Sequence, residues 1–359
     1  MNEPLIEVKD LRVEFDVRAG VIKAVDGLWL NINRGQTMGV IGESGCGKSV
    51  TARAILQMIP KPGKISNGEI LYYRRIKKDG HSEAQDILKI TDLNPDGDII
   101  RQIRGGEIGM IFQEPMSSLT PVYTAGTQIA EAVTLHRLIP IKKVGDQMAE
   151  TITGHRKVTK KEARQIAIEM LHKVGIPKPE ERVDNYPHQL SGGQRQRVMT
   201  AIALCCEPQM LIADEPTTAL DVSIEAQILD LMRGLQETVA MSIMFITHNL
   251  GVIAEMADEI TVMYMGKQVE KAKTIPLFYE ARHPYTRALL KSIPKVGKKT
   301  SERLASIEGM VPDPFNLPPG CVFHPRCPSF MPGKCDKIAP TWKKVAEDHE
   351  VRCLLYEEV

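Results

Sequence analysis

The run Gly42-Glu43-Ser44-Gly45-Cys46-Gly47-Lys48-Ser49 constrains this chain more than any other feature, because it fits the pattern G-x-x-x-x-G-K-S/T. It follows an apolar, strand-like run at 37–41 and precedes a helix-like run at 50–58. In that context, glycines let backbone N–H groups converge on phosphates at a helix N-terminus. Lys48 adds a positive charge, and Ser49 adds a hydroxyl ligand for Mg²⁺. The sequence therefore predicts a phosphate-binding loop.

Apolar β-type runs alternate with helix-like segments from residue 7 to about residue 269, which predicts an α/β domain with a largely parallel sheet. The expected strands of this sheet are 37–41, 108–112, 210–213, 242–246 and 260–264. Runs at 6–8 and 21–25 predict antiparallel strands at its edge. Helical spacing from 124 to about 186 predicts an inserted helical subdomain, and the polar stretch 74–106 predicts a surface excursion.

Composition excludes several classes of protein. Among 359 residues, 46 Lys and Arg balance 45 Asp and Glu, so the net charge of +1 lacks the positive field of a dedicated nucleic-acid binder. No apolar run approaches the length that crosses a bilayer, and residues 1–7 do not resemble a signal peptide. We therefore expect a protein of the cytosol that binds no nucleic acid.

A second acidic motif lies at 210–215, where the apolar run Met-Leu-Ile-Ala ends in Asp214 and Glu215. The first carboxylate of such a strand end would hold Mg²⁺, directly or through water, beside the phosphate loop. The second, Glu215, would polarise an attacking water. An apolar strand that ends in Asp-Glu is also a common polar strand end, so the neighbouring motif decides between the two interpretations.

That neighbouring motif is Leu190-Ser191-Gly192-Gly193-Gln194, which opens a predicted helix at 195–206. Together with the two motifs on either side, it resembles the signature of ABC-type ATPases. The resemblance implies that the Ser and Gly backbone N–H groups form a second phosphate cradle at a helix N-terminus, which serves the nucleotide bound by the opposite subunit.

Other positions match this family one by one. Gln113 resembles the glutamine that contacts Mg²⁺ and the attacking water, and Asp221, in Thr218-Ala219-Leu220-Asp221, resembles the loop that crosses the dimer interface. His248 resembles the histidine that holds the γ-phosphate, and Phe15 lies where the family has an aromatic residue stacked on adenine. Taken alone, Asp221 would be a helix N-cap, His248 a surface or capping residue and Phe15 a core residue.

The resemblance implies three catalytic residues, which are Gln113, Glu215 and His248. The implied Mg²⁺ ligands are Ser49, Gln113 and Asp214. The implied nucleotide-binding residues are Phe15, Gly42, Ser44, Gly45, Cys46, Gly47, Lys48, Ser49, Val50, Ser191, Gly192, Gly193, Gln194, Asp214 and Asp221.

Three further segments narrow the resemblance to the ATP-binding subunits of dipeptide, oligopeptide and nickel importers: 113–121, 186–190, and His283-Pro284-Tyr285-Thr286-Arg287-Ala288-Leu289. This branch implies ATP hydrolysis that powers import. Its expected partners are two membrane permeases, an identical or paralogous ATPase and, indirectly, an extracellular peptide-binding protein, with the chain held peripherally on the cytoplasmic side of the membrane. The cargo, dipeptide, oligopeptide or nickel, stays open.

The family implies a P-loop NTPase fold with a RecA-like core, an antiparallel β subdomain and a helical subdomain at about 114–190. We expect an ATPase domain at 1–272 and a C-terminal appendage at 273–359, where prolines interrupt any long helix. Four of the seven cysteines, Cys321, Cys327, Cys335 and Cys353, fall in this appendage.

Cytosolic disulfides are disfavoured, and four thiolates can hold a metal. Because no tight Cys pair is present, we expect a 4Fe-4S cluster, with zinc or free buried thiols as the alternatives. The sequence also argues against two other classes of function. A soluble ABC ATPase acting on nucleic acid or ribosomes would usually carry two cassettes, a long coiled coil or a basic surface. A metal-sensing module would require degenerate ATPase motifs, and these motifs are intact.

Overall fold

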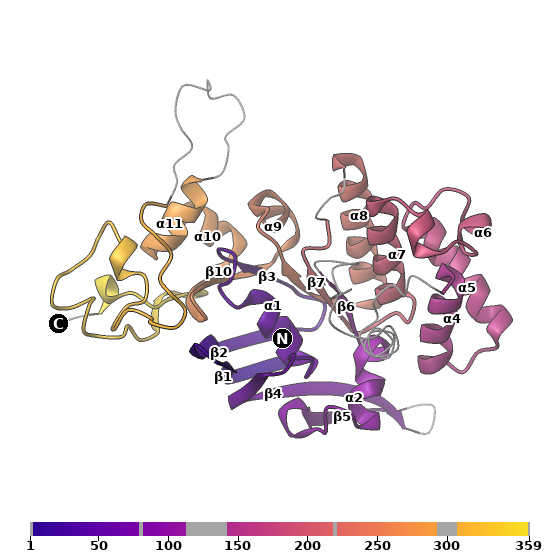
Figure 1. Ribbon diagram of the computed structural model, residues 1–359, viewed down its shortest axis with the longest axis horizontal. Helices are drawn as coiled ribbons and strands as arrows, with labels where there is room; N and C mark the ends of the chain where they lie inside the picture. Colours follow the sequence, from indigo (N-terminus) through magenta and orange to yellow (C-terminus); the bar gives the residue numbers. More distant parts are fainter. Residues whose placement is uncertain (1–2, 79–81, 113–141, 218–220, 293–306, 358–359) are drawn as a thin grey trace. The chain divides into compact units, whose positions relative to one another are not determined.

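The computed structural model describes residues 3–78, 82–112, 142–217, 221–292 and 307–357. The chain forms two compact units, each considered by itself below. The first unit joins Met1–Leu93 to Phe245–Val359, and the second is Asn94–Met244. Figure 1 labels the elements along the chain.

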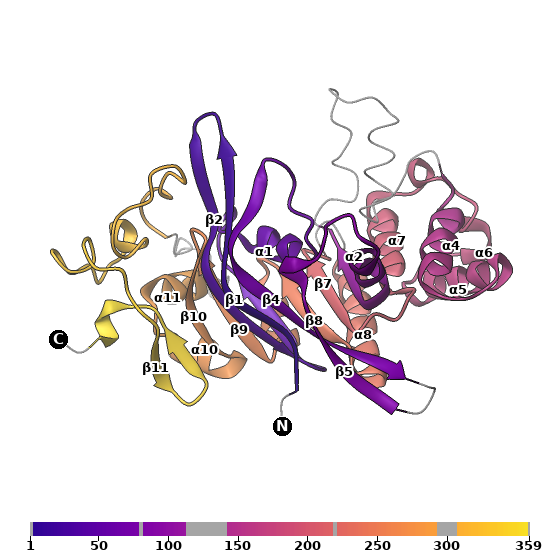
Figure 2. The ribbon, with the colours of Figure 1, turned by 90° about the horizontal axis from the view of Figure 1, so that it is seen from below.

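The first unit begins with long antiparallel strands (Figure 2). Its elements up to residue 93 are β1 (Pro4–Val17), β2 (Gly20–Asn33), β3 (Thr37–Ile41), α1 (Lys48–Ile55), β4 (Gly63–Lys78), β5 (Ser82–Lys89) and a 3-10 turn at Ile90–Asp92. Four of these strands form a sheet in the order β2-β1-β4-β5. On β1, Leu5, Ile6, Val8, Leu11 and Val13 are fully buried. The antiparallel strands predicted near the N-terminus are thus present, and they are longer than predicted. Their predicted place at the edge of the parallel sheet is wrong, because β1 pairs with β2 and β4 in a separate sheet.

The remaining elements of the first unit build a second sheet around β3. They are α9 (Leu250–Met256), β9 (Glu259–Tyr264), β10 (Lys267–Lys273), α10 (Thr274–Glu280), α11 (Pro284–Lys291), β11 (Lys343–Ala346), β12 (His349–Val351) and 3-10 turns at His324–Arg326 and Leu354–Tyr356. β3 pairs with β9 in parallel, while β9, β10, β12 and β11 follow in antiparallel order. All five residues of β3 are buried, as expected for a parallel strand covered on both faces.

The second unit is mainly helical. Its elements are α2 (Asp98–Gln102), a π turn at Ile103–Glu107, β6 (Ile108–Ile111), α4 (Val144–His155), α5 (Lys160–Lys173), α6 (Pro179–Arg182), a 3-10 turn at Pro187–Gln189, α7 (Gly192–Leu204), β7 (Met210–Asp214) and α8 (Val222–Val239). β6 and β7 pair in parallel, with Ile108 opposite Met210. Strand β8 (Ser242–Ile246) leads from this unit back to the first.

Two predictions about organisation have different outcomes. Helices α4, α5 and α6 confirm helical structure over the described part of the predicted helical subdomain. The polar stretch 74–106 was wrongly expected to be an excursion between strands, because Leu71 to Lys78 pair with Lys89 to Ser82 in an antiparallel ribbon. Apolar side chains of this ribbon can be exposed, as Ile87 is at 56%. The ribbon therefore lacks the apolar alternation that marks a half-buried strand. The domain boundary at residue 272 stays a prediction.

Candidate functional site

The phosphate loop needs glycine at two positions for steric reasons. Gly42 has φ 151° and Gly47 has φ 101°, values that side-chain-bearing residues rarely adopt. A Cβ atom at Gly42 would collide with the carbonyl oxygen of Met263, and one at Gly47 with that of Ala24. The loop backbone is therefore packed against β9 and β2, while Ser44 and Gly45 in the middle of the loop are exposed.

Lys48 is held inside this loop. Its Nζ donates to the carbonyl oxygens of Gly42 (2.8 Å) and Glu43 (2.9 Å), and the residue is 7% exposed. Thr51 Oγ1 donates to the Gly47 carbonyl (3.0 Å), which stabilises the first turn of α1. The ammonium group is thus fixed at the centre of the loop, where it can meet a phosphate without losing much further side-chain entropy.

The other predicted loop residues have differing exposure. Ser44 and Gly45 are exposed, and Ser49 and Val50 are half-buried at the start of α1. Cys46 is 2% exposed, and burial raises the pKa of its thiol. Phe15 is half-buried on β1, opposite Gly63 of β4. Its predicted contact with adenine stays a prediction.

In the second unit, all residues of β7 are buried and the strand ends at Asp214, which is 2% exposed. Glu215 follows with φ 51°, a left-handed conformation that is uncommon for a residue with a side chain. Such outliers persist where the surrounding structure holds them, and they cluster at functional sites. The structure thus places both predicted carboxylates directly at the end of a buried strand.

The signature motif opens α7. Ser191 Oγ accepts a hydrogen bond from the Gln194 backbone N–H (3.3 Å), and Gln194 Oε1 accepts one from the Ser191 N–H (3.1 Å). This reciprocal capping box holds the first turn, and Ser191 and Gly192 are exposed. A Cβ at Gly192 would meet nothing within 4 Å. The exposed helix N-terminus suits the second phosphate cradle that the sequence implies.

Three further predicted residues have mixed outcomes. Asp221 caps α8 by accepting from the Ile224 N–H (3.1 Å), so its alternative interpretation as an N-cap is confirmed. His248 is exposed after β8, next to Asn249, which caps α9. Gln113 lies outside the described residues. The predicted site residues are therefore divided between the two units, with the loop and His248 in the first and Asp214, Glu215 and Ser191 in the second.

The four C-terminal cysteines all lie in the first unit. Cys321 donates its backbone N–H to the Cys335 carbonyl (2.9 Å). Burial, with smaller contributions from Cys321, Cys327 and Cys335, raises the pKa of the Cys353 thiol to about 12. Yet no group of three or more His, Cys, Asp or Glu side chains in the described part of the chain could hold a metal ion. The side chains as arranged do not fit a metal, so the expected 4Fe-4S cluster and its zinc alternative are not supported.

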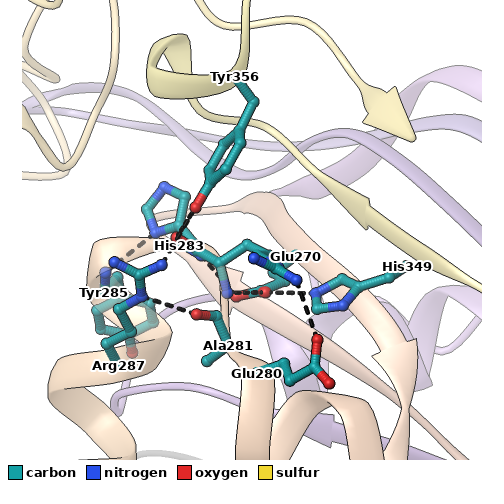
Figure 3. Close-up of polar contacts among 9 residues, drawn as sticks. Glu270, Glu280, Ala281, His283, Tyr285, Arg287, His349 and Tyr356 are labelled. Carbon is teal, nitrogen blue, oxygen red and sulfur yellow. Dashed lines mark hydrogen bonds and ion pairs between the residues drawn. The ribbon is translucent and has the colours of Figure 1, made fainter. Parts of the chain in front are cut away.

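A buried polar network that the sequence analysis missed surrounds Glu270 of β10 (Figure 3). Glu270 is 0% exposed and accepts hydrogen bonds from His349 Nε2 (2.7 Å) and from the backbone N–H groups of Arg282 (2.5 Å) and His283 (3.0 Å). Burial alone would raise the pKa of Glu270, but these hydrogen bonds outweigh it and lower the pKa. The network ties the start of α11 and strand β12 to β10.

His283 belongs to this network and is the N-cap of α11. Burial lowers its pKa to about 4, so the ring is neutral near pH 7, and its Nδ1 accepts from the Tyr285 N–H (3.1 Å). The sequence analysis used the His-Pro-Tyr segment only as a mark of resemblance. In the structure this segment supplies the helix cap and places Tyr285.

Comparisons with known proteins match the whole chain. Residues 25–218 match the family described as "ABC transporter", and residues 269–335 match "Oligopeptide/dipeptide transporter, C-terminal region". A putative peptide import ATP-binding protein of Brucella ovis is 43% identical over 100% of this chain and 99% of its own length. The oligopeptide transport ATP-binding protein AppD of Bacillus subtilis is 44% identical over 99% of this chain and 97% of its own.

A solved structure is similar as well. The dimeric structure of MJ0796, named as a bacterial ABC transporter cassette, superposes with a TM-score of 0.60 and 26% identity. The match covers 75% of this chain and 99% of that one.

Proposed function

The chain belongs to the ABC transporter family, in the branch with the oligopeptide/dipeptide transporter C-terminal region, and we propose that it is the ATP-hydrolysing subunit of a peptide importer. The observation that carries this proposal is the phosphate loop, with Lys48 held at its centre, in a chain that matches peptide import relatives over nearly their full length. The names of these relatives favour a peptide over nickel as the cargo. They also favour an importer over an ATPase that acts on nucleic acid or ribosomes.

Each proposed site residue has a separate role in ATP hydrolysis. The loop N–H groups and Lys48 bind the phosphates of ATP, and Ser49, Gln113 and Asp214 would hold Mg²⁺. Bound Mg²⁺ neutralises charge on the transferred phosphoryl group. Glu215 accepts a proton from the attacking water, while His248 holds the γ-phosphate. Support comes from the buried strand end at Asp214 and from the strained backbone of Glu215.

ATP would be bound between two ATPase subunits, identical or paralogous. The exposed Ser191 and Gly192 at the start of α7 would cradle the γ-phosphate held by the partner's loop. The dimeric structure of the similar cassette supports this arrangement. Closure of the dimer would drive two permease subunits, to which an extracellular protein delivers the peptide.

We place the chain peripherally on the cytoplasmic side of the membrane, held there by the permeases. Membership of a transporter family supports this placement. Across the described ranges, the structure contains no helix both long enough and apolar enough to cross a bilayer.

Ser191→Arg should separate nucleotide binding from dimer formation. The bulky cation replaces an exposed helix cap at the proposed interface, while the phosphate loop of the same chain is untouched. We expect the monomer to bind ATP within about twofold of the parent, while the ATP-dependent dimer disappears, because a clash at the centre of an interface costs several kcal/mol. Nucleotide titration and light scattering with ATP, in a Glu215→Gln background, measure both.

Thr153→Arg on α4 is the matched control, since Thr153 is also exposed and lies outside every proposed contact. It should dimerise like the parent. A loss of monomer ATP binding in Ser191→Arg equal to that in Lys48→Ala would contradict the shared site.

We propose separately that Cys321, Cys327, Cys335 and Cys353 bind a metal, as a 4Fe-4S cluster or as zinc, once their side chains adopt other rotamers. Support comes from the proximity of the four thiols, since Cys321, Cys327 and Cys335 all contribute to the raised pKa of Cys353. Protein purified without oxygen should contain about four irons, or one zinc, per chain. Cys327→Ser should lose the metal, and Cys206→Ser, outside the cluster, should keep it. Parent protein without iron or zinc would contradict the proposal.

A further inference from the structure

Two side chains from the C-terminal part of the first unit contact Glu43, the residue after the first glycine of the phosphate loop. Tyr285 Oη accepts a hydrogen bond from the Glu43 backbone N–H (2.8 Å). Arg326 binds both carboxylate oxygens of Glu43, with Nη1 at 2.7 Å and Nη2 at 3.2 Å. Position 43 is variable in the loop pattern, so the motif itself gives Glu43 no role.

Tyr285 is held rigidly where it meets the loop. It is 0% exposed, and its ring centroid lies 4.7 Å from that of Tyr264 and 5.4 Å from that of Phe323. Burial raises the pKa of its phenol, so the hydroxyl stays protonated and its oxygen can accept from Glu43. The start of α11 that carries it is fixed in turn by the Glu270 network (Figure 3).

Arg326 is equally well placed. Its side chain is 4% exposed, and besides Glu43 it donates to the carbonyl oxygens of Ile307 (3.1 Å) and Glu308 (3.2 Å) and to Tyr264 Oη (3.3 Å). The hydrogen bonds to Glu43 raise the pKa of the guanidinium, against the effect of burial. A two-point contact between a planar guanidinium and a carboxylate fixes direction as well as distance. Arg326 is therefore a permanent positive charge aimed at the loop.

Glu43 connects these anchors to the lysine that binds phosphate. Its carbonyl oxygen accepts from Lys48 Nζ (2.9 Å) and from the Cys46 backbone N–H (3.3 Å). Its N–H and carboxylate are taken by Tyr285 and Arg326, so all three polar parts of one residue are engaged. Any movement of Glu43 would move the oxygen to which Lys48 is bound.

Resting on the proposed ATP site, we propose that Tyr285 and Arg326 are positioning residues, which hold the phosphate loop in its ATP-binding conformation through Glu43. Arg326 has a second effect, which is electrostatic. It neutralises a carboxylate in a loop that must accept a polyphosphate, because an unpaired Glu43 would repel the ligand.

The charges of Glu43 and Arg326 predict an unusual order of ATP affinities among the variants. Arg326→Gln leaves Glu43 negative and unpaired, so ATP should bind about tenfold more weakly. Glu43→Gln weakens the two-point contact with Arg326 but removes the repulsion, so its ATP affinity should lie between those of the parent and Arg326→Gln. The double variant Arg326→Gln/Glu43→Gln should recover most of the loss of Arg326→Gln. Titration with a fluorescent ATP analogue, at low and at high salt, measures all four proteins, and the defect of Arg326→Gln should shrink as salt rises.

Arg352→Gln is the matched control for general loosening of the C-terminal part. Arg352 stacks on Trp342, with its guanidinium 4.8 Å from the ring, and donates to the Gly27 carbonyl (3.4 Å). This variant should bind ATP like the parent. If Arg326→Gln binds no worse than Arg352→Gln, or if the double variant binds more weakly than Arg326→Gln, the proposal is overturned.

Tyr285→Phe tests the backbone contact, since it keeps the ring and removes only the acceptor. Amide hydrogen exchange in the peptide containing Glu43 should accelerate by about tenfold, with little change at β1 and β2. Unchanged exchange would overturn this half of the proposal. Lys48→Ala tests the proposed ATP site separately from the role of Arg326. If the ATP site is wrong, the parent and Lys48→Ala proteins should bind ATP equally, whatever the affinity of Arg326→Gln.

Discussion

Glu215→Gln should trap ATP in the protein and lower its hydrolysis rate by about a hundredfold or more, the range typical of losing a general base. The amide has nearly the shape of the carboxylate but cannot accept a proton from water. Asp214 and Lys48 are unchanged, so the phosphates and Mg²⁺ should still bind. Single-turnover hydrolysis and ATP affinity, measured with whichever permeases the normal activity requires, separate the two effects.

Glu207→Gln is a close control for this variant. Glu207 lies in the same unit, also has positive φ (53°), and its side chain forms a long ion pair with Arg156 (3.8 Å). It should hydrolyse ATP like the parent. Hydrolysis by Glu215→Gln within a few-fold of the parent rate would show that Glu215 is not the base.

Lys48→Ala should weaken ATP binding by about a hundredfold, because it removes a charge-assisted contact to phosphate that contributes about 2–3 kcal/mol. It also frees the carbonyl oxygens of Gly42 and Glu43, which Lys48 Nζ holds in the structure. Hydrolysis should fall below detection at ATP concentrations that saturate the parent. Equilibrium titration with ATP gives the affinity directly.

Lys273→Ala provides the comparison for this second variant. Lys273 ends β10 and forms an exposed ion pair with Asp348 (2.6 Å), the kind of contact that contributes little. Its loss should leave ATP binding unchanged. An affinity of Lys48→Ala equal to that of Lys273→Ala would mean that the loop does not bind the phosphates.

The sequence predicted those parts of the site that depend on a few consecutive residues. Glycines at 42 and 47 were recognisable because only they tolerate the backbone that the loop requires. The start of α7 was recognisable because Ser191 and Gln194 cap it across three residues. The strand that ends at Asp214 was recognisable because its first four residues are all apolar.

Other features could not be predicted from the sequence, because the residues that form them are far apart in the chain or follow no recognisable pattern. Strand β5 pairs with β4 and begins with a largely polar run at 82–86, which lacks the apolar alternation of a half-buried strand. Glu270 and His349 are 79 residues apart, and neither belongs to a sequence pattern that predicts a buried pair. The cysteine spacing suggested a metal ligand set, but spacing along the chain does not determine how thiols are oriented in a folded segment.

Local chemistry thus determined where this chain would bind phosphate, since the loop, its lysine and the helix that follows are specified within a dozen residues. Only the tertiary structure decided what holds that loop. Arg326 and Glu43 are separated by 283 residues, and their contact exists because Phe323, Tyr285 and Tyr264 pack together and carry Arg326 to the loop. Packing of side chains from distant segments depends on the whole fold, and the sequence around either residue contains no sign of it.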